Sequence, residues 1–336
     1  MPPTIDELFS NDVIQVYPAG TPAAQLQHTY TDVRLGRNQQ RIDFDQVQSL
    51  LASLRADVEQ WYAGETGKQM DTYDLGEMLH AVQQRFWSDS RFQQAFDLLE
   101  LPSEKKESVP IPWWNEVAGG EVEHDPDSIH VLLGPRHSYE TQLIRSGHHL
   151  PIKSVSVAGL IASNDGHLVI GLRGGKSYPN TYHINAGALR VTEGLRRGEE
   201  SIYDVFKQLE LAPEFGLRNE DVAGATIHSR IMDFAIDRGP MYNFLVQTRL
   251  SWFQLGQRWL ENIEKDKAEH QEIYYIGANP QDINQFIRNT YIGICANRVN
   301  RKRHEIHLLH PGALALASYS GLPVSELRAL YQEGVH

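Results

Sequence analysis

The stretch that decides the fold runs from Gly187 to Leu217, reading GALRVTEGL over 187–195 and LELAPEFGL over 209–217. Apolar residues between these ends recur at three- and four-residue steps, as one face of a helix requires: Ile202, Val205, Phe206 and Leu209. The stretch therefore predicts a glycine-led loop followed by an amphipathic helix that packs on a sheet.

Two acidic residues close this stretch. Glu210 and Glu214 lie four residues apart, so on a continuous helix their carboxylates share one face and can reach a common cation. Pro213 stands between them, and a proline inside a helix removes a hydrogen bond and clashes with the carbonyl four residues back, at a cost of about 3 kcal/mol. We expect the helix to end or kink near Ala212.

The order of these residues resembles the Nudix box. Gly187 and Glu193 have the five intervening residues of that pattern, and the end of the box is matched by Glu210, Leu211, Glu214, Gly216 and Leu217. The resemblance covers roughly residues 153–282 and implies an α/β (α+β) class, with a Nudix-like α/β/α sandwich built on a mixed sheet.

The resemblance also implies a reaction, which is hydrolysis of a phosphoanhydride bond in a nucleoside diphosphate linked to another moiety. Carboxylates would hold Mg²⁺ or Mn²⁺, which neutralises the charge that develops on the phosphate oxygens. The implied catalytic residues are Glu210, Glu214 and Glu193, and the implied metal ligands are Glu210, Glu214 and Glu272, with Glu269 as another acidic residue of the same later loop. Arg173 and Tyr182 are expected to bind the substrate.

Three departures from the pattern keep other interpretations open. Fifteen residues separate Glu193 from Leu209 where the pattern has seven, Leu209 replaces the motif arginine, and Pro213 replaces one glutamate. A register that starts at Gly198 loses the metal glutamates, so the first register is preferred. One alternative is a catalytically impaired Nudix-fold protein that senses a nucleotide ligand or binds another protein. Another is an unrelated α/β binding or scaffold protein.

The chain divides into two predicted parts. A mainly helical region with a linker covers 1–128, and a Nudix-like domain covers 129–336, with its core at about 153–290. The clearest elements of that domain are a β-hairpin turning at 164–166, strands at 241–250 and 273–276, and a helix at 280–288. In the first part, apolar spacing predicts a helix over 44–62 that stops near Gly64, and two further helices before residue 102.

Composition narrows the class of partner. The chain has 336 residues, a formal net charge of -12 and one cysteine, Cys295. The acidic balance argues against a general nucleic-acid surface, because such surfaces need clustered Lys and Arg. A basic N-terminal signal and a membrane-length apolar run are both missing, so we expect a cytoplasmic protein without membrane contact. The N-terminal helices have two open roles, which are covering the site and mediating a homodimer.

Overall fold

The computed structural model describes residues 4–26, 29–32, 44–67, 85–86, 88–91, 94, 117–122, 125–133, 152–174, 180–189, 192–233, 239–263, 270–293 and 307–334. The chain forms two compact units. The larger unit comprises 1–28, 153–189 and 193–336, and the smaller comprises 29–152 and 190–192. The first 28 residues join the larger unit because strand β1 pairs with β10 and because Leu8 and Phe9 pack in its core.

A ten-stranded sheet forms the centre of the larger unit. Its main path runs in the order β1 (Ile14–Val16), β10 (Val222–Asp233), β11 (Gly239–Thr248), β6 (Ser156–Ala162), β7 (His167–Arg173), β8 (Thr181–His183), β14 (His307–Leu309) and β13 (Tyr291–Gly293). Strand β12 (His270–Gly277) pairs with β7, and β9 (Asn185–Ala188) pairs with β6. The β11–β6 pair is parallel and the β10–β11 pair is antiparallel, so the sheet is mixed.

The predicted hairpin is confirmed. Strands β6 and β7 are antiparallel, with Ala162 opposite Leu168, and Gly166 takes a φ of 83° in the turn between them. Glycine suits this position because residues that carry a side chain rarely adopt a positive φ. The predicted strands at 241–250 and 273–276 and the helix at 280–288 are also confirmed, as β11, β12 and α10 (Pro280–Arg288).

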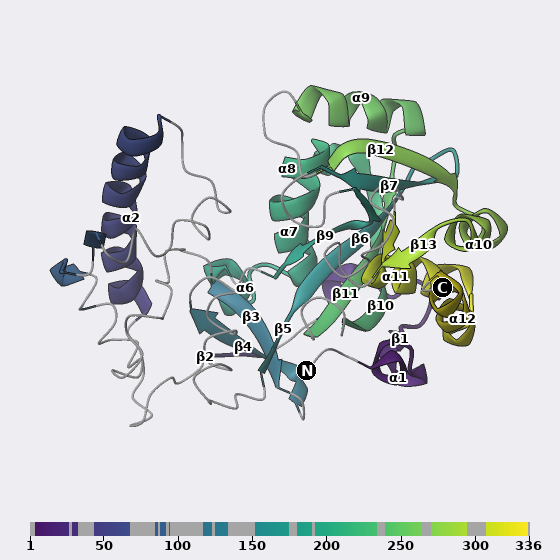
Figure 1. Ribbon diagram of the computed structural model, residues 1–336, viewed down its shortest axis with the longest axis horizontal. Coiled ribbons are helices and arrows are strands. Elements are labelled where there is room, and N and C mark those ends of the chain that lie inside the picture. The colour runs from purple at the N-terminus through teal and green to yellow at the C-terminus, as the bar shows by residue number, and fades with distance from the viewer. Residues whose placement is uncertain are drawn as a thin grey trace. The chain divides into compact units, whose positions relative to one another are not determined.

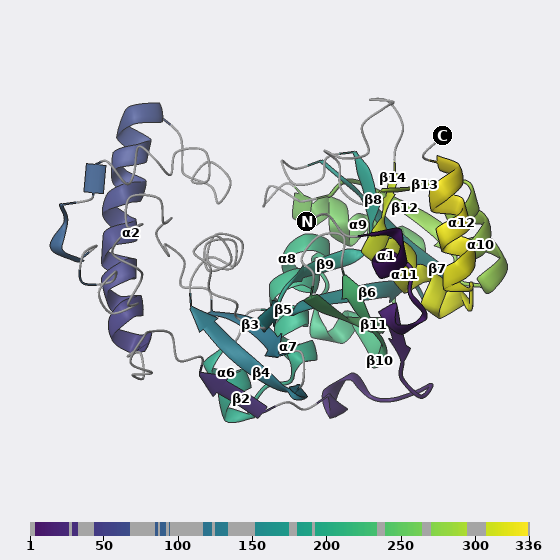
Figure 2. The ribbon, with the colours of Figure 1, turned by 60° about the horizontal axis from the view of Figure 1, so that its bottom comes forward.

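Helices cover both faces of this sheet, as Figures 1 and 2 show from two directions. One layer contains α7 (Ile202–Phe206), the π-turn η4 (Lys207–Leu211), α8 (Ala212–Phe215) and α9 (Trp252–Ile263). The other contains α10, α11 (His310–Ser320) and α12 (Val324–Gly334). The short helices α1 (Ile5–Leu8) and α6 (Glu193–Arg197) complete the unit. The α+β class with a mixed sheet is therefore confirmed.

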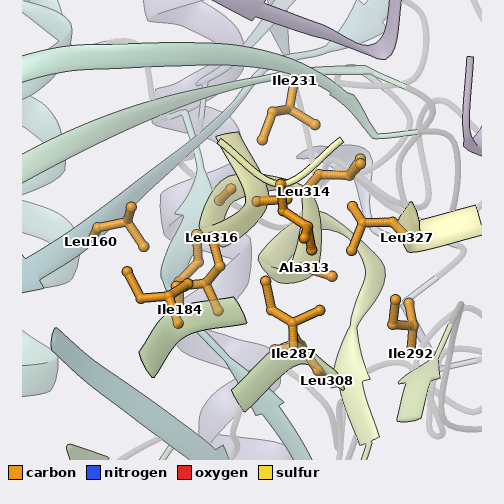
Figure 3. Close-up of a cluster of buried hydrophobic side chains, with 14 of the residues drawn as sticks. Leu160, Ile184, Ile231, Ile287, Ile292, Leu308, Ala313, Leu314, Leu316 and Leu327 are labelled. Atoms are coloured by element: carbon orange, nitrogen blue, oxygen red, sulfur yellow. The ribbon is translucent and has the colours of Figure 1, made fainter. Parts of the chain in front are cut away.

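The alternation of side chains along β6 explains the two layers. Ala158, Leu160 and Ala162 face the layer with α11, and Figure 3 shows Leu160 in the same cluster as Leu314 and Leu316 of that helix. On the other face, Gly159 lies under Phe206 of α7, whose ring stacks on Phe244 at 5.6 Å between centroids. Burying one such side chain contributes about 1.5–3 kcal/mol, so both layers are held mainly by apolar burial.

The helix of the opening stretch does not end at Ala212. Helical dihedral angles continue through Pro213 to Phe215, and Gly216 closes the helix with a φ of 66°. The chain accommodates the proline by a π-turn in which the Ala212 N–H bonds to the Lys207 carbonyl, five residues back. One extra residue in the turn widens the helix just before the proline ring, and such π-turns often lie at functional sites.

The smaller unit is not purely helical in the part that the structure describes. Helix α2 (Phe44–Thr66) confirms the predicted helix, although it passes Gly64 and stops before Gly67, which has a φ of 68°. The described strands form a four-stranded sheet in the order β2 (Thr29–Asp32), β4 (Asp125–Leu133), β3 (Val117–Val122) and β5 (Ile152–Ser154). The domain boundary expected between 128 and 129 falls inside β4.

Several sequence features lie outside the described residues, including most of the second and third predicted helices, Glu269 and Cys295. Among the helices that the structure describes, none has the length and apolar character needed to cross a bilayer.

Candidate functional site

Glu210 points from the π-turn onto strand β9. Its carboxylate lies directly over Gly187, where a Cβ atom would overlap Oε1. Only 9% of Glu210 is exposed. Gly187 stands opposite Val157 in the β6–β9 ladder, so this carboxylate faces the sheet on the side that α7 and α8 cover. The first glycine of the opening stretch thus makes room for the first of its two helix carboxylates.

Glu214 also points onto β9, where it meets Asn185, two residues before Gly187. Asn185 donates a hydrogen bond from Nδ2 to Glu214 Oε2, and Asn185 is itself buried. Residues two apart on a strand share a face and are separated by about 6.6–6.8 Å between Cα atoms. The two glutamates therefore face neighbouring positions of β9. They share one face of the helix, as their four-residue separation in sequence predicts, although Pro213 lies between them.

A buried histidine completes the environment of Glu214. His270 Nε2 lies 3.4 Å from Glu214 Oε2, and the residue is only 1% exposed. Its ring packs against Phe215 at 5.6 Å between centroids and lies over Gly171, where a Cβ atom would overlap the ring. Glycine at 171 thus leaves room for the ring to pack against β7, within reach of the carboxylate.

Basic character comes from the end of β7. Arg173 is 6% exposed and pairs with His270 in the β7–β12 ladder. Burial lowers the pKa of His183 well below its ordinary value, with smaller contributions from Arg173 and His270. Neutral His183 and permanently charged Arg173 therefore lie close to one another on this side of the sheet.

Several polar atoms of this group lack a hydrogen-bond partner within the described residues. They are His183 Nδ1, Asn185 Oδ1 and both ring nitrogens of His270. Buried polar atoms are nearly always paired with protein, water or a ligand, and each exception calls for a cause. Three of these atoms, those of Asn185 and His270, lie on the face that carries the Glu210 and Glu214 carboxylates and mark it as the candidate site, whereas His183 Nδ1 lies beside Gly312 of α11. We call the group of Arg173, His183, Asn185, Glu210, Glu214 and His270 the buried polar cluster.

The predicted three-glutamate metal set is not assembled. Glu272 pairs with Leu172 and accepts a hydrogen bond from the Tyr274 hydroxyl, which places it on the opposite face from Arg173 and His270. A register shift between His270 and Glu272 accompanies this placement. In the described parts of the chain, no group of three or more His, Cys, Asp or Glu residues is arranged to hold a metal ion.

The remaining predicted residues lie elsewhere. Tyr182 also pairs with Leu172, and its ring contacts Tyr274 at 5.3 Å and Phe286 of α10 at 5.5 Å. It therefore belongs to an aromatic group under α10, across the sheet from the carboxylates. Glu193 begins α6, and the structure describes the backbone of this residue but not its side chain. Of the predicted site residues, Glu210, Glu214 and Arg173 lie on the same face of the sheet.

Sequence reasoning missed three members of the cluster, His183, Asn185 and His270. His183 and Asn185 lie just before Gly187, so their nearness to the box was a usable signal. His270 is remote in sequence and reaches the site only through pairing of β12 with β7.

No family model matches the chain, and no curated protein matches it. Solved structures similar to parts of the chain include a protein of Deinococcus radiodurans, with 11% identity, coverage of 39% of this chain and 71% of that chain, and a TM-score of 0.27. A bifunctional NMN adenylyltransferase/ADP ribose pyrophosphatase of Francisella tularensis has 14% identity, coverage of 45% and 41%, and a TM-score of 0.26. A MutT/nudix family protein of Enterococcus faecalis has 14% identity, coverage of 41% and 50%, and a TM-score of 0.23.

Proposed function

We propose that this chain hydrolyses a phosphoanhydride bond in a nucleoside diphosphate derivative, with a divalent cation, Mg²⁺ or Mn²⁺, bound at Glu210 and Glu214. The observation that carries the proposal is the placement of these two carboxylates on one helix, both turned onto β9. Their order along the chain, led by Gly187, is the part of the sequence that resembles the Nudix box.

The donor set fits a hard cation. Mg²⁺ in proteins commonly takes one or two carboxylates and fills its other positions with water and substrate phosphate oxygens, so a three-residue protein cage is not required. A cation near a carboxylate that has lost hydration also stabilises its charged form. When bound, the cation would neutralise charge on the diphosphate and lower the pKa of a coordinated water.

The other members of the cluster would bind and orient. Arg173 carries a charge at any physiological pH and can donate two parallel hydrogen bonds to a phosphate group. The Asn185 amide fixes the rotamer of Glu214, because it holds Oε2 from the strand beneath. Gly187 leaves free the space that the Glu210 carboxylate occupies, because a Cβ atom there would overlap Oε1.

The experiment is a hydrolysis assay on a panel of dinucleotides and nucleotide sugars, with Mg²⁺, with Mn²⁺ and with a chelator. We expect release of a nucleoside monophosphate from at least one compound, dependence on the cation, and its loss in Glu210→Gln and Glu214→Gln. Glu220→Gln is the matched control, because its side chain is 72% exposed and pairs only with surface Arg218 at 3.6 Å among the contacts described.

Two results would contradict the proposal. Turnover that survives both Glu→Gln changes would place the chemistry elsewhere. Thermal stabilisation by a nucleotide without turnover of any compound would instead assign the chain to the ligand-sensing alternative.

A further inference from the structure

His270 has a buried ring with no hydrogen bond to either nitrogen among the described residues. It is 1% exposed, and leaving a buried donor or acceptor unpaired is unfavourable, because the atom loses its hydration without gaining a partner. The ring is nevertheless held firmly, by Phe215 on one side and by the Gly171 backbone on another. A residue kept in this position at such a cost needs a partner that approaches Nε2.

The distance to Glu214 indicates what this partner is. Nε2 and Oε2 are 3.4 Å apart, and they do not form a hydrogen bond. Two ligands of a tetrahedral cation with bonds of 2.0–2.1 Å are separated by about 3.4 Å, the edge of that tetrahedron. The two atoms therefore have the spacing of neighbouring ligands in one coordination sphere.

We propose that His270 Nε2 and Glu214 Oε2 bind the same divalent cation, and that this site prefers Mn²⁺, Co²⁺ or Zn²⁺ to Mg²⁺. Imidazole nitrogen suits the transition metals, whereas Mg²⁺ prefers oxygen ligands. With two protein ligands, the other positions are taken by water or by ligand oxygens. This inference rests on the part of the proposed function that puts a cation at Glu214.

A simple ion pair is the competing explanation for the same contact. If His270 is only a positive partner of Glu214, it repels a cation, and its removal leaves cation affinity unchanged or raises it. If Nε2 is a ligand, removal of the imidazole lowers affinity for transition metals and changes Mg²⁺ affinity little. The sign of the change therefore separates the two.

The test measures cation affinity by calorimetry in the absence of any nucleotide, on the full chain at neutral pH. We expect His270→Gln and His270→Ala to weaken Mn²⁺ and Zn²⁺ binding by at least about tenfold, since even outer-shell partners contribute 10- to 100-fold. His167→Gln is the matched control, because His167 Nδ1 lies at the same 3.4 Å from a carboxylate, that of Asp165, but at an exposed position. Circular dichroism verifies that each variant is folded.

A second measurement identifies the ligand atom directly. Pulsed electron paramagnetic resonance of the Mn²⁺-loaded protein should show hyperfine coupling to a histidine nitrogen, and the coupling should disappear in His270→Gln and persist in His167→Gln. Unchanged or tighter Mn²⁺ binding in the folded His270 variants, or a coupling that survives them, would overturn the inference. Because neither measurement uses a substrate, nitrogen coupling in a chain that hydrolyses nothing would uphold the inference while the proposed hydrolysis failed.

Discussion

Gly187 lies so close to the carboxylate of Glu210 that a Cβ atom at position 187 would overlap Oε1 and would lie 2.7 Å from Oε2. The strand and the helix that carry these residues are separated in sequence by α6, yet they meet here. Glycine is therefore required here by the space that the carboxylate occupies rather than by a backbone conformation.

The first prediction concerns this contact. Gly187→Ala should destabilise the fold by about 1–3 kcal/mol, because a methyl group forced into a packed site displaces its neighbour. It should also weaken cation binding, because the displaced neighbour is Glu210. Urea unfolding and calorimetry measure the two effects. Gly224→Ala is the control, because a Cβ atom there meets nothing within 4 Å.

A double-mutant cycle tests the cause. If the collision with Glu210 produces the loss of stability, Gly187→Ala should cost much less in a Glu210→Ala background. Equal costs in both backgrounds would show that the strand, and not the carboxylate, resists the methyl group.

The second prediction concerns Asn185. Asn185→Asp removes the donor that holds Glu214 and puts a second negative charge beside it. We expect the apo protein to lose about 1–3 kcal/mol, since Glu214 loses a buried hydrogen bond. Saturating Mn²⁺ should restore much of that stability, because a cation neutralises both charges. Thermal melting with and without Mn²⁺ measures this, and a variant that the cation does not rescue would contradict a cation site at Glu214.

The third prediction uses Gly171. Gly171→Ala should push the His270 ring away from β7, because the new Cβ atom would overlap its Nδ1 and Cε1 positions. Both carboxylates stay in place, so Zn²⁺ affinity should fall while Mg²⁺ affinity is kept. Calorimetry with the two ions measures the difference, and an equal fall for both ions would count against ligation by His270.

The sequence predicts those parts of the site whose residues lie close together in one segment of the chain. The hairpin around Gly166, the helix stripe and the shared face of Glu210 and Glu214 follow from spacing along one segment. The π-turn does not, because periodicity rules assume a regular helix and, with Pro213 in the sequence, predict only that the helix ends or kinks near Ala212.

Strand pairing decides the rest. Glu272 and His270 are two residues apart and would share a face on a regular strand, but a register shift between them sends Glu272 to the side of Leu172 and leaves His270 beside Glu214. A single sequence carries no readable signal for that shift. Tyr182 is turned from the carboxylates for a related reason, because its register with Leu172 fixes the face that it occupies.

The last prediction concerns stability against pH and the N-terminal segment. His310 Nε2 lies 2.9 Å from the Leu8 carbonyl oxygen, and its ring packs edge-on against Phe9. Burial lowers the pKa of His310 from 6.5 to about 4. The unfolded chain therefore binds a proton at a higher pH than the folded chain does, so stability is lost as the pH falls from 6.5 towards 4. The loss from this residue should reach about 3 kcal/mol.

Urea unfolding across that pH range measures the loss. His310→Gln cannot titrate, so its stability should fall less steeply over the same window than that of the wild type. Burial also lowers the pKa of His228, so a smaller slope should remain in the variant. Parallel curves for the wild type and His310→Gln would show that burial does not hold this histidine neutral, and that another group sets the acid limit of the fold.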